Sequence, residues 1–193
     1  MSEENSSVSA LRATAHPVRL RILSLLTASA LSAAEIAREL DLTHANASYH
    51  LRVLADAGAV VEAGEEKIRG GVAKRYRHPW DLYRTEGRKG AGPEDGDVYV
   101  RAMAEELVRR FGERARGTRG WTTDAELWVT PEVWQRVVAL VEEASSLVHT
   151  EAQPPRTAGT LHVNLTAAAF QLSADPSPIQ PDPRRVAPEV TGR

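Results

Sequence analysis

Side chains that could contact nucleic acid recur on one face of a predicted helix, residues 44–57. Its apolar residues Ala47, Leu51 and Leu54 follow helical spacing, which places them on the inner face. The outward positions are then His44, Ala45, Asn46, Ser48, Tyr49 and Arg52. The amide of Asn46 could bond an adenine edge, and the guanidinium of Arg52 could hold guanine or a phosphate. This pattern predicts contact with base edges in a DNA major groove.

The elements just before this helix would hold it in place. Ser32-Ala33-Ala34-Glu35 fits a capping box, which predicts the start of a short helix ending near Leu40. Asp41-Leu42-Thr43 follows as a tight turn in which Thr43 suits the N-cap, and Gly58 suits the end of the next helix. Two short helices joined by a tight turn, the second with a polar outer face, are typical of a helix-turn-helix.

Flanking segments predict a complete winged domain. Helical spacing begins at Val8, and a second helix is expected to start at Pro17, because proline is tolerated in a first turn. Residues 59–63 and 72–78 are predicted strands, joined by a charged loop that contains Gly70-Gly71. The hairpin carries the basic residues that we expect to contact phosphates: Lys67, Arg69, Lys74, Arg75 and Arg77.

Over about residues 9–80 the chain resembles the ArsR-type family of winged helix-turn-helix repressors. The resemblance rests on His16-Pro17-Val18-Arg19 and on His50-Leu51-Arg52-Val53-Leu54-Ala55-Asp56-Ala57-Gly58 at the end of the recognition helix. It implies a homodimer on double-stranded DNA at a palindromic operator, with the recognition helices in successive major grooves. It also implies a wing at residues 59–78, and packing or capping roles for His16 and His50.

The sensory residues of the metal-binding members of that family are missing. The scaffold helix has Ala33-Ala34-Glu35-Ile36-Ala37 in place of a thiolate pair, and the predicted helix from Asp97 contains no histidine. The chain has no cysteine, which excludes disulfides and thiolate metal sites. Because the remaining histidines are scattered, we expect no metal and no cofactor.

Composition narrows the class of protein further. Residues 1–90 carry 13 Lys/Arg against 11 Asp/Glu, and the rest carry 11 against 15, so the mildly basic half is the predicted DNA-binding one. No apolar run approaches the roughly 18–20 residues of a membrane span, and the polar, acidic start does not resemble a signal peptide. With no phosphate loop or catalytic triad evident, we expect a cytoplasmic protein that is not an enzyme.

The C-terminal half predicts a different kind of element. Asp97–Arg116 has a helical apolar stripe and is expected to form most of a dimer interface together with the N-terminal helix. Asp124–Val129 and Thr160–Leu172 are predicted strands on either side of a helix that begins at Thr130-Pro131, which suggests a β-α-β unit. Two strands alone are marginal, so they must pack on the preceding helix, pair with the dimer mate, or both. Trp128 to Trp134 is similar to a segment of actinobacterial members of the same regulator class.

Four aromatic side chains leave two interpretations open. Trp121, Trp128, Trp134 and Phe170 could line a pocket for a small-molecule effector, or could form the core of a small C-terminal layer. The sequence does not identify an effector.

The expected fold class is mainly α with a small β component (α+β): a winged helix-turn-helix plus a C-terminal helical dimerisation and β-α-β region. The expected division is a disordered start (1–7), a DNA-binding domain (8–86), a linker (87–96), a dimerisation and effector-binding region (97–172) and a disordered Pro-rich tail (173–193). The leading hypothesis is a dimeric transcriptional repressor. The alternative is a winged helix that binds proteins, with a ligand-sensing C-terminal region. A continuous basic surface at residues 44–52 and 67–77 would favour DNA, and a neutral apolar one would favour protein.

Overall fold

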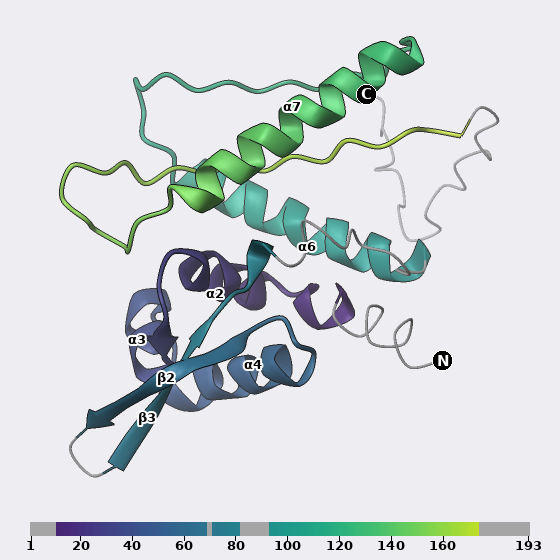
Figure 1. The fold of residues 1–193 in the computed structure, drawn as a ribbon. Coiled ribbons are helices and arrows are strands. Elements are labelled where there is room, and N and C mark those ends of the chain that lie inside the picture. The colour runs from purple at the N-terminus through teal and green to yellow at the C-terminus, as the bar shows by residue number, and fades with distance from the viewer. Residues whose placement is uncertain (1–10, 69–70, 82–92, 174–193) are drawn as a thin grey trace, which may run out of the picture.

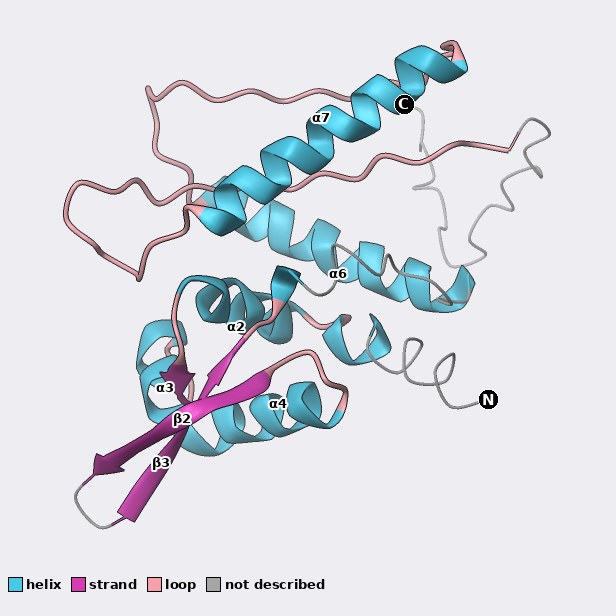
Figure 2. Ribbon diagram, viewed as in Figure 1, coloured by secondary structure: helices cyan, strands magenta, loops and turns pink. Residues whose placement is uncertain are grey.

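The computed structural model describes residues 11–68, 71–81 and 93–173. The elements are α2 (Pro17–Ala28), β1 (Leu31–Ser32), α3 (Ala33–Leu40), α4 (His44–Asp56), β2 (Val61–Ile68), β3 (Gly71–Arg77), α6 (Pro93–Gly112) and α7 (Pro131–Thr150). Helices α2, α3 and α4 and the sheet form a winged helix. Helices α6 and α7 lie beyond α2, away from α4 and the hairpin (Figures 1 and 2). This confirms the predicted α+β class. The predictions for residues 1–10, Arg69, 87–92 and 174–193 fall outside the described residues.

One apolar cluster joins the helices of the winged helix to its sheet. Ile22 and Leu26 of α2, Ile36 of α3 and Leu54 of α4 are fully buried within it. They come from three helices because each helix places an apolar residue on one face every three or four positions. A truncation of any of them would leave a cavity at the point where the recognition helix is seated.

Side-chain caps fix the ends of α3 and the start of α4. The Ser32 hydroxyl accepts the Glu35 N–H at 3.4 Å, and the Glu35 carboxylate accepts the Ser32 N–H at 2.7 Å, which confirms the predicted capping box. Asp41 then adopts a left-handed conformation with φ 54°, which turns the chain sharply. The Thr43 hydroxyl accepts the Asn46 N–H at 3.2 Å, as predicted, so α4 starts at a defined residue and orientation.

The sheet is larger than the predicted hairpin. Its strand order is β1-β3-β2 and all pairs are antiparallel, with Leu31 opposite Tyr76 and Val61 opposite Arg77. Strand β1 was missed because its two residues also begin the capping box, and so short a strand shows no alternation of its own. The hairpin strands are also shifted from the predicted 59–63 and 72–78, because Ala59 and Val60 are used in the core.

The predicted long C-terminal helix, Asp97–Arg116, was wrong by four residues at each end. Helix α6 begins at Pro93 and ends at Gly112, so part of the expected linker 87–96 is helical. Pro93 suits the first turn of a helix, and Glu94 and Asp95 interact favourably with the positive end of its dipole. The glycines in this stretch suggested a linker, but one glycine inside a helix costs only about 1 kcal/mol.

Helix α6 packs on α2 with a polar face rather than with its apolar stripe. Its buried residues are Asp95, Ala102 and Glu106, and Arg12 reaches Asp95 at 3.5 Å. Burial alone would raise the pKa of Glu106, but the guanidiniums of Arg109 and Arg110 hydrogen-bond it and hold that pKa below its ordinary value. The apolar stripe therefore faces away from α2 and is exposed at Val100, Leu107, Val108 and Phe111.

The predicted β-α-β unit is not formed within the described residues. Helix α7 is present and is capped by Thr130 as expected, but Asp124–Val129 and Thr160–Leu172 are extended without pairing in any sheet. The two segments run along different sides of α7 in Figure 1. A strand requires a neighbouring backbone for its hydrogen bonds, and the described chain places none beside either segment.

Candidate nucleic-acid interface

The outer face of α4 is polar and open to solvent. Its predicted inner residues Ala47, Leu51 and Leu54 are at most 2% exposed, which confirms the predicted phase of the helix. Ser48 is half-buried, and the remaining outward positions are exposed: His44, Ala45, Asn46, Tyr49 and Arg52. One helical face thus presents an amide, a phenol and a guanidinium, which are groups that bind base edges and phosphates.

The turn before α4 allows this face to enter a groove. Helix α3 packs against α4, and the Leu42 N–H bonds the Ala37 carbonyl at 2.9 Å, which closes the turn between them. Figure 1 shows α4 and the β2–β3 hairpin on the side of the winged helix that faces away from α6 and α7. No described element of the C-terminal half covers the outer face of α4, so the helix is accessible to a duplex.

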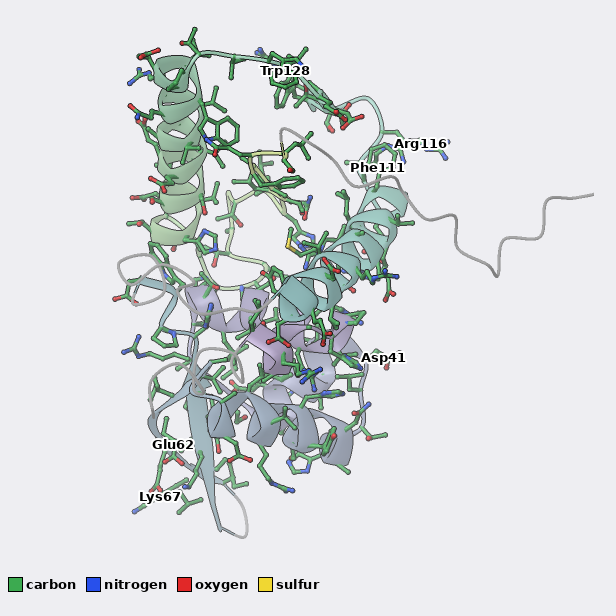
Figure 3. All side chains as sticks on the ribbon, turned by 90° about the vertical axis from the view of Figure 1, so that its right-hand side faces the viewer. Asp41, Glu62, Lys67, Phe111, Arg116 and Trp128 are labelled. Carbon is green, nitrogen blue, oxygen red and sulfur yellow. The ribbon has the colours of Figure 1, made fainter. Side chains whose placement is uncertain are left out.

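The hairpin carries basic residues with different surroundings. Lys67 is exposed near the hairpin tip, whereas the Lys74 ammonium bonds the Glu62 carboxylate at 2.6 Å. Figure 3 shows Glu62 and Lys67 at the far end of the molecule from Trp128. Arg77 is also exposed. Three acidic residues, Glu62, Glu65 and Glu66, lie on β2, so the charge of the hairpin is mixed rather than uniformly basic.

Arg75 is anchored inside the winged helix. Its guanidinium donates to the Ala30 carbonyl at 2.6 Å and to Glu66 at 2.6 Å, and it lies 3.3 Å from Glu35. Burial pushes the pKa of Glu35 up, but Ser32 and Arg75 together hold it below the ordinary value. Arg75 therefore links β3 to the capping box of α3. Sequence reasoning missed this role because it depends on the long-range pairing of Ser32 with Arg75.

His50, on the buried face of the recognition helix α4, lies against His16, the residue before α2. The rings of His16 and His50 are 4.9 Å apart, and the His16 Nδ1 accepts the Val18 N–H at 3.1 Å, which caps α2 as the family resemblance implied. The Nδ1 of His50 is buried without a hydrogen-bond partner among the described atoms. Burial lowers the pKa of both rings, and the charge of Arg19 lowers both further. Burial and the charge of Arg19 therefore both favour the neutral form of these rings.

This arrangement predicts that the protein loses stability in acid. The folded pKa of His50 lies below the unfolded value of 6.5, so the unfolded chain binds more protons as the pH falls. The free energy of unfolding should be highest above about pH 6.5 and should decline as the pH falls toward the folded pKa. Urea unfolding between pH 8 and pH 5 measures this slope. His50→Leu should make the slope shallower, and an equal or steeper slope in that variant would contradict the interpretation.

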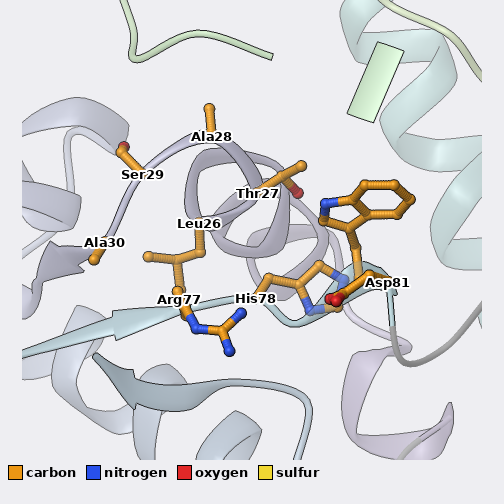
Figure 4. Close-up of a pocket in the computed structure, with 9 residues that line it drawn as sticks. Leu26, Thr27, Ala28, Ser29, Ala30, Arg77, His78 and Asp81 are labelled. Carbon is orange, nitrogen blue, oxygen red and sulfur yellow. The ribbon is translucent and has the colours of Figure 1, made fainter. Parts of the chain in front are cut away.

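The four aromatic residues proposed for an effector pocket line neither of the two hollows found in the described residues. Trp121 and Trp128 are 84% and 93% exposed, Phe170 is also exposed and Trp134 is half-buried. A hollow of about 220 Å³ lies between the end of α2 and the residues after β3 (Figure 4). A second, of about 380 Å³, lies between α3 and Pro154-Pro155. Neither hollow is lined by any of the four, so the effector site stays a prediction.

His78 in the first hollow has a structural role. Its backbone N–H donates to the Leu26 carbonyl at 2.9 Å, and its ring Nδ1 lies 2.7 Å from the Ala59 carbonyl.

Across residues 11–68, 71–81 and 93–173, no group of three His, Asp or Glu side chains that could hold a metal ion is present. The same residues include no helix that is both long enough and apolar enough to cross a bilayer.

Comparison with known families agrees with this geometry. Residues 14–63 match a family model described as a helix-turn-helix domain. The matched span runs from the residues before α2 through α4 and into β2, so it contains the whole exposed face of the recognition helix. Among curated proteins, no match to the chain was found. The chain therefore contains a helix-turn-helix domain, which indicates a DNA-binding regulator.

Proposed function

We propose that the protein is a sequence-specific transcriptional repressor of the ArsR-like winged-helix type, acting as a homodimer on a palindromic operator. The observation that carries this proposal is the exposed polar face of α4, seated by Leu51 and Leu54 within a helix-turn-helix domain. Asn46 and Arg52 on that face would bind base edges, and exposed basic residues of the hairpin would bind phosphate. The bound dimer would repress transcription if its operator overlaps the DNA that the transcription machinery must bind.

A dimer is part of the proposal for a physical reason. One short recognition helix contacts too few base pairs to select an operator from a genome, and two helices about one helical turn apart double that number. The exposed apolar stripe of α6, which includes Leu107 and Phe111, offers a surface for a second copy. The alternative of a protein-binding winged helix is disfavoured by the polar outer face of α4, on which Tyr49 is the one large exposed hydrophobic residue.

A salt titration tests whether the hairpin contacts DNA. Each cationic group that neutralises a phosphate adds about 0.9 to the slope of log affinity against log salt. Lys67→Ala should therefore lower the slope by about 0.9 per subunit, with a similar loss of affinity for operator and random duplex. Binding isotherms measured by fluorescence anisotropy at several salt concentrations give the slope.

Arg75→Ala is the matched control, because it removes a cation whose donors are already used within the protein. It should lower the free energy of unfolding and leave the salt slope nearly unchanged. An unchanged slope for Lys67→Ala would show that the hairpin stands clear of the duplex, even if α4 still binds.

A further inference from the structure

Most of the uncovered apolar surface lies in the C-terminal half. Apart from Tyr49, Ile68 and Val72, every large hydrophobic residue that is exposed in the described chain lies beyond residue 97. Helix α7 has no buried residue over its twenty positions, although it carries apolar side chains from Val133 to Val148. Soluble monomers rarely expose a contiguous apolar patch of more than a few hundred Å². This surface is therefore of the kind that a partner covers.

Two extended segments beside α7 have the pattern of strands. Leu161, Val163 and Leu165 alternate with polar residues, and Leu127 to Val129 form a second apolar stretch before α7. Within the part of the chain that the structure describes, neither segment belongs to a sheet. A row of unpaired backbone N–H and C=O groups beside apolar side chains is a template for pairing with another strand.

Contacts within the chain attach the second segment to α6 and the end of α7 to the winged helix. Arg110 of α6 donates to the Asn164 side chain at 3.0 Å, which fixes the second segment beside α6. The Trp80 and His149 rings are 5.1 Å apart, and Arg156 bonds Glu39 of α3 at 2.6 Å. These contacts tie the end of α7 and the following loop to the winged helix. In Figure 1 the two extended segments run along different sides of α7.

We propose that the partner is a second copy of this chain, and that the two extended segments of each copy pair with those of the other in one shared sheet. This inference rests on the proposed dimeric function. Each chain supplies both unpaired strand edges and an uncovered helix. In a two-fold dimer the same surface of both copies meets, so each segment of one copy can pair with a segment of the other. The shared sheet would be covered by α7 of both copies, and the exposed stripe of α6 would continue the interface.

The available area suits such an interface. A standard protein interface buries about 800 Å² on each partner, and a large aromatic side chain contributes about 150–250 Å². Trp121, Trp128 and Phe170 are mostly exposed, as are Leu161 at 86% and Val163 at 66%. These side chains alone supply a large share of a stable dimer surface. The interface would also bury aromatic side chains that are exposed in one chain.

Substitution of Val163 tests the shared sheet. Val163 is two-thirds exposed in one chain, so Val163→Asp should disturb nothing unless a second chain covers the residue. We expect the wild type to sediment as a dimer at micromolar concentration, and Val163→Asp to sediment as a folded monomer. Asn164→Asp is the control: it adds the same charge at the neighbouring position, keeps an acceptor for Arg110 and should remain dimeric.

Crosslinking tests the same pairing without a destabilising charge. Because the chain contains no cysteine, two differently tagged chains can carry one each, Val129→Cys in one and Val163→Cys in the other. After co-expression, a short bifunctional maleimide should join the two unlike chains in high yield. A matched pair with Val72→Cys in the wing in place of Val163→Cys should give little product.

The outcomes separate this inference from the proposed function. A dimer that binds duplex DNA, survives Val163→Asp and gives no crosslink would overturn the shared sheet and leave the regulator proposal standing. A wild-type monomer that binds no duplex DNA would overturn both. Loss of the dimer in Val163→Asp together with the crosslink between unlike chains is the result that the inference requires.

Discussion

Leu51→Ala is expected to lower the free energy of unfolding by about 2–5 kcal/mol, the range for truncating a buried leucine. Leu51 is 2% exposed and belongs to the core cluster that joins α4 to α2 and α3. The alanine would leave a cavity directly beneath the recognition helix. Urea unfolding at a fixed protein concentration measures the change, since the stability of a dimer depends on concentration.

Its neighbour provides the control for that prediction. Arg52 lies on the outer face of the same turn of α4, so Arg52→Ala should change the free energy of unfolding by no more than about 0.5 kcal/mol. A pair in which Arg52→Ala unfolds the protein while Leu51→Ala leaves it stable would show that the helix is rotated from the orientation described.

The double substitution Asn46→Ala with Arg52→Ala should abolish specific operator binding while the protein stays folded. A good bidentate contact to a base is worth about 1–3 kcal/mol, and each substitution occurs twice in a dimer. A single substitution should therefore cost about 2–6 kcal/mol, or roughly thirty-fold to twenty-thousand-fold in affinity. Titration of the operator duplex, with a random duplex beside it, measures the loss of specificity.

Arg116→Ala is the matched control for Arg52, because Arg116 is an exposed arginine beside Phe111, far from the wing (Figure 3). It removes the same charge without touching α4 and should leave operator affinity unchanged. Equal losses in Arg116→Ala and Arg52→Ala would indicate a general electrostatic effect, not base recognition.

The N-terminal half was predictable because its signals are local. The Ser32–Glu35 capping box, the Thr43 N-cap and the spacing of Ala47, Leu51 and Leu54 each involve residues within a few positions of one another. Such signals fix helix ends and helix phase without knowledge of the rest of the chain. The exposed set on α4 followed directly from that phase.

The features that the sequence could not predict depend on distant residues. Contact of Arg75 with DNA stays a prediction, and the structure adds a bond from its guanidinium to the Ala30 carbonyl, 45 positions away, which no local pattern indicates. Asp124–Val129 and Thr160–Leu172 show another limit, because their alternation predicted strands and the described residues supply no neighbouring strand for either segment. Alternation of apolar and polar residues predicts a strand with one apolar and one polar face. It does not indicate whether the strand that pairs with it belongs to the same chain or to another.

Footprinting in cells, with the tagged wild type compared with the Asn46→Ala variant, tests whether the protein binds specific DNA sequences as a dimer through base contacts of α4. We expect protected sites with two-fold symmetry, their half-sites about 10–10.5 bp apart or a multiple of that, and loss of these sites in the variant. Protection of asymmetric or random sequence, or a pattern that the Asn46→Ala variant leaves intact, would contradict it.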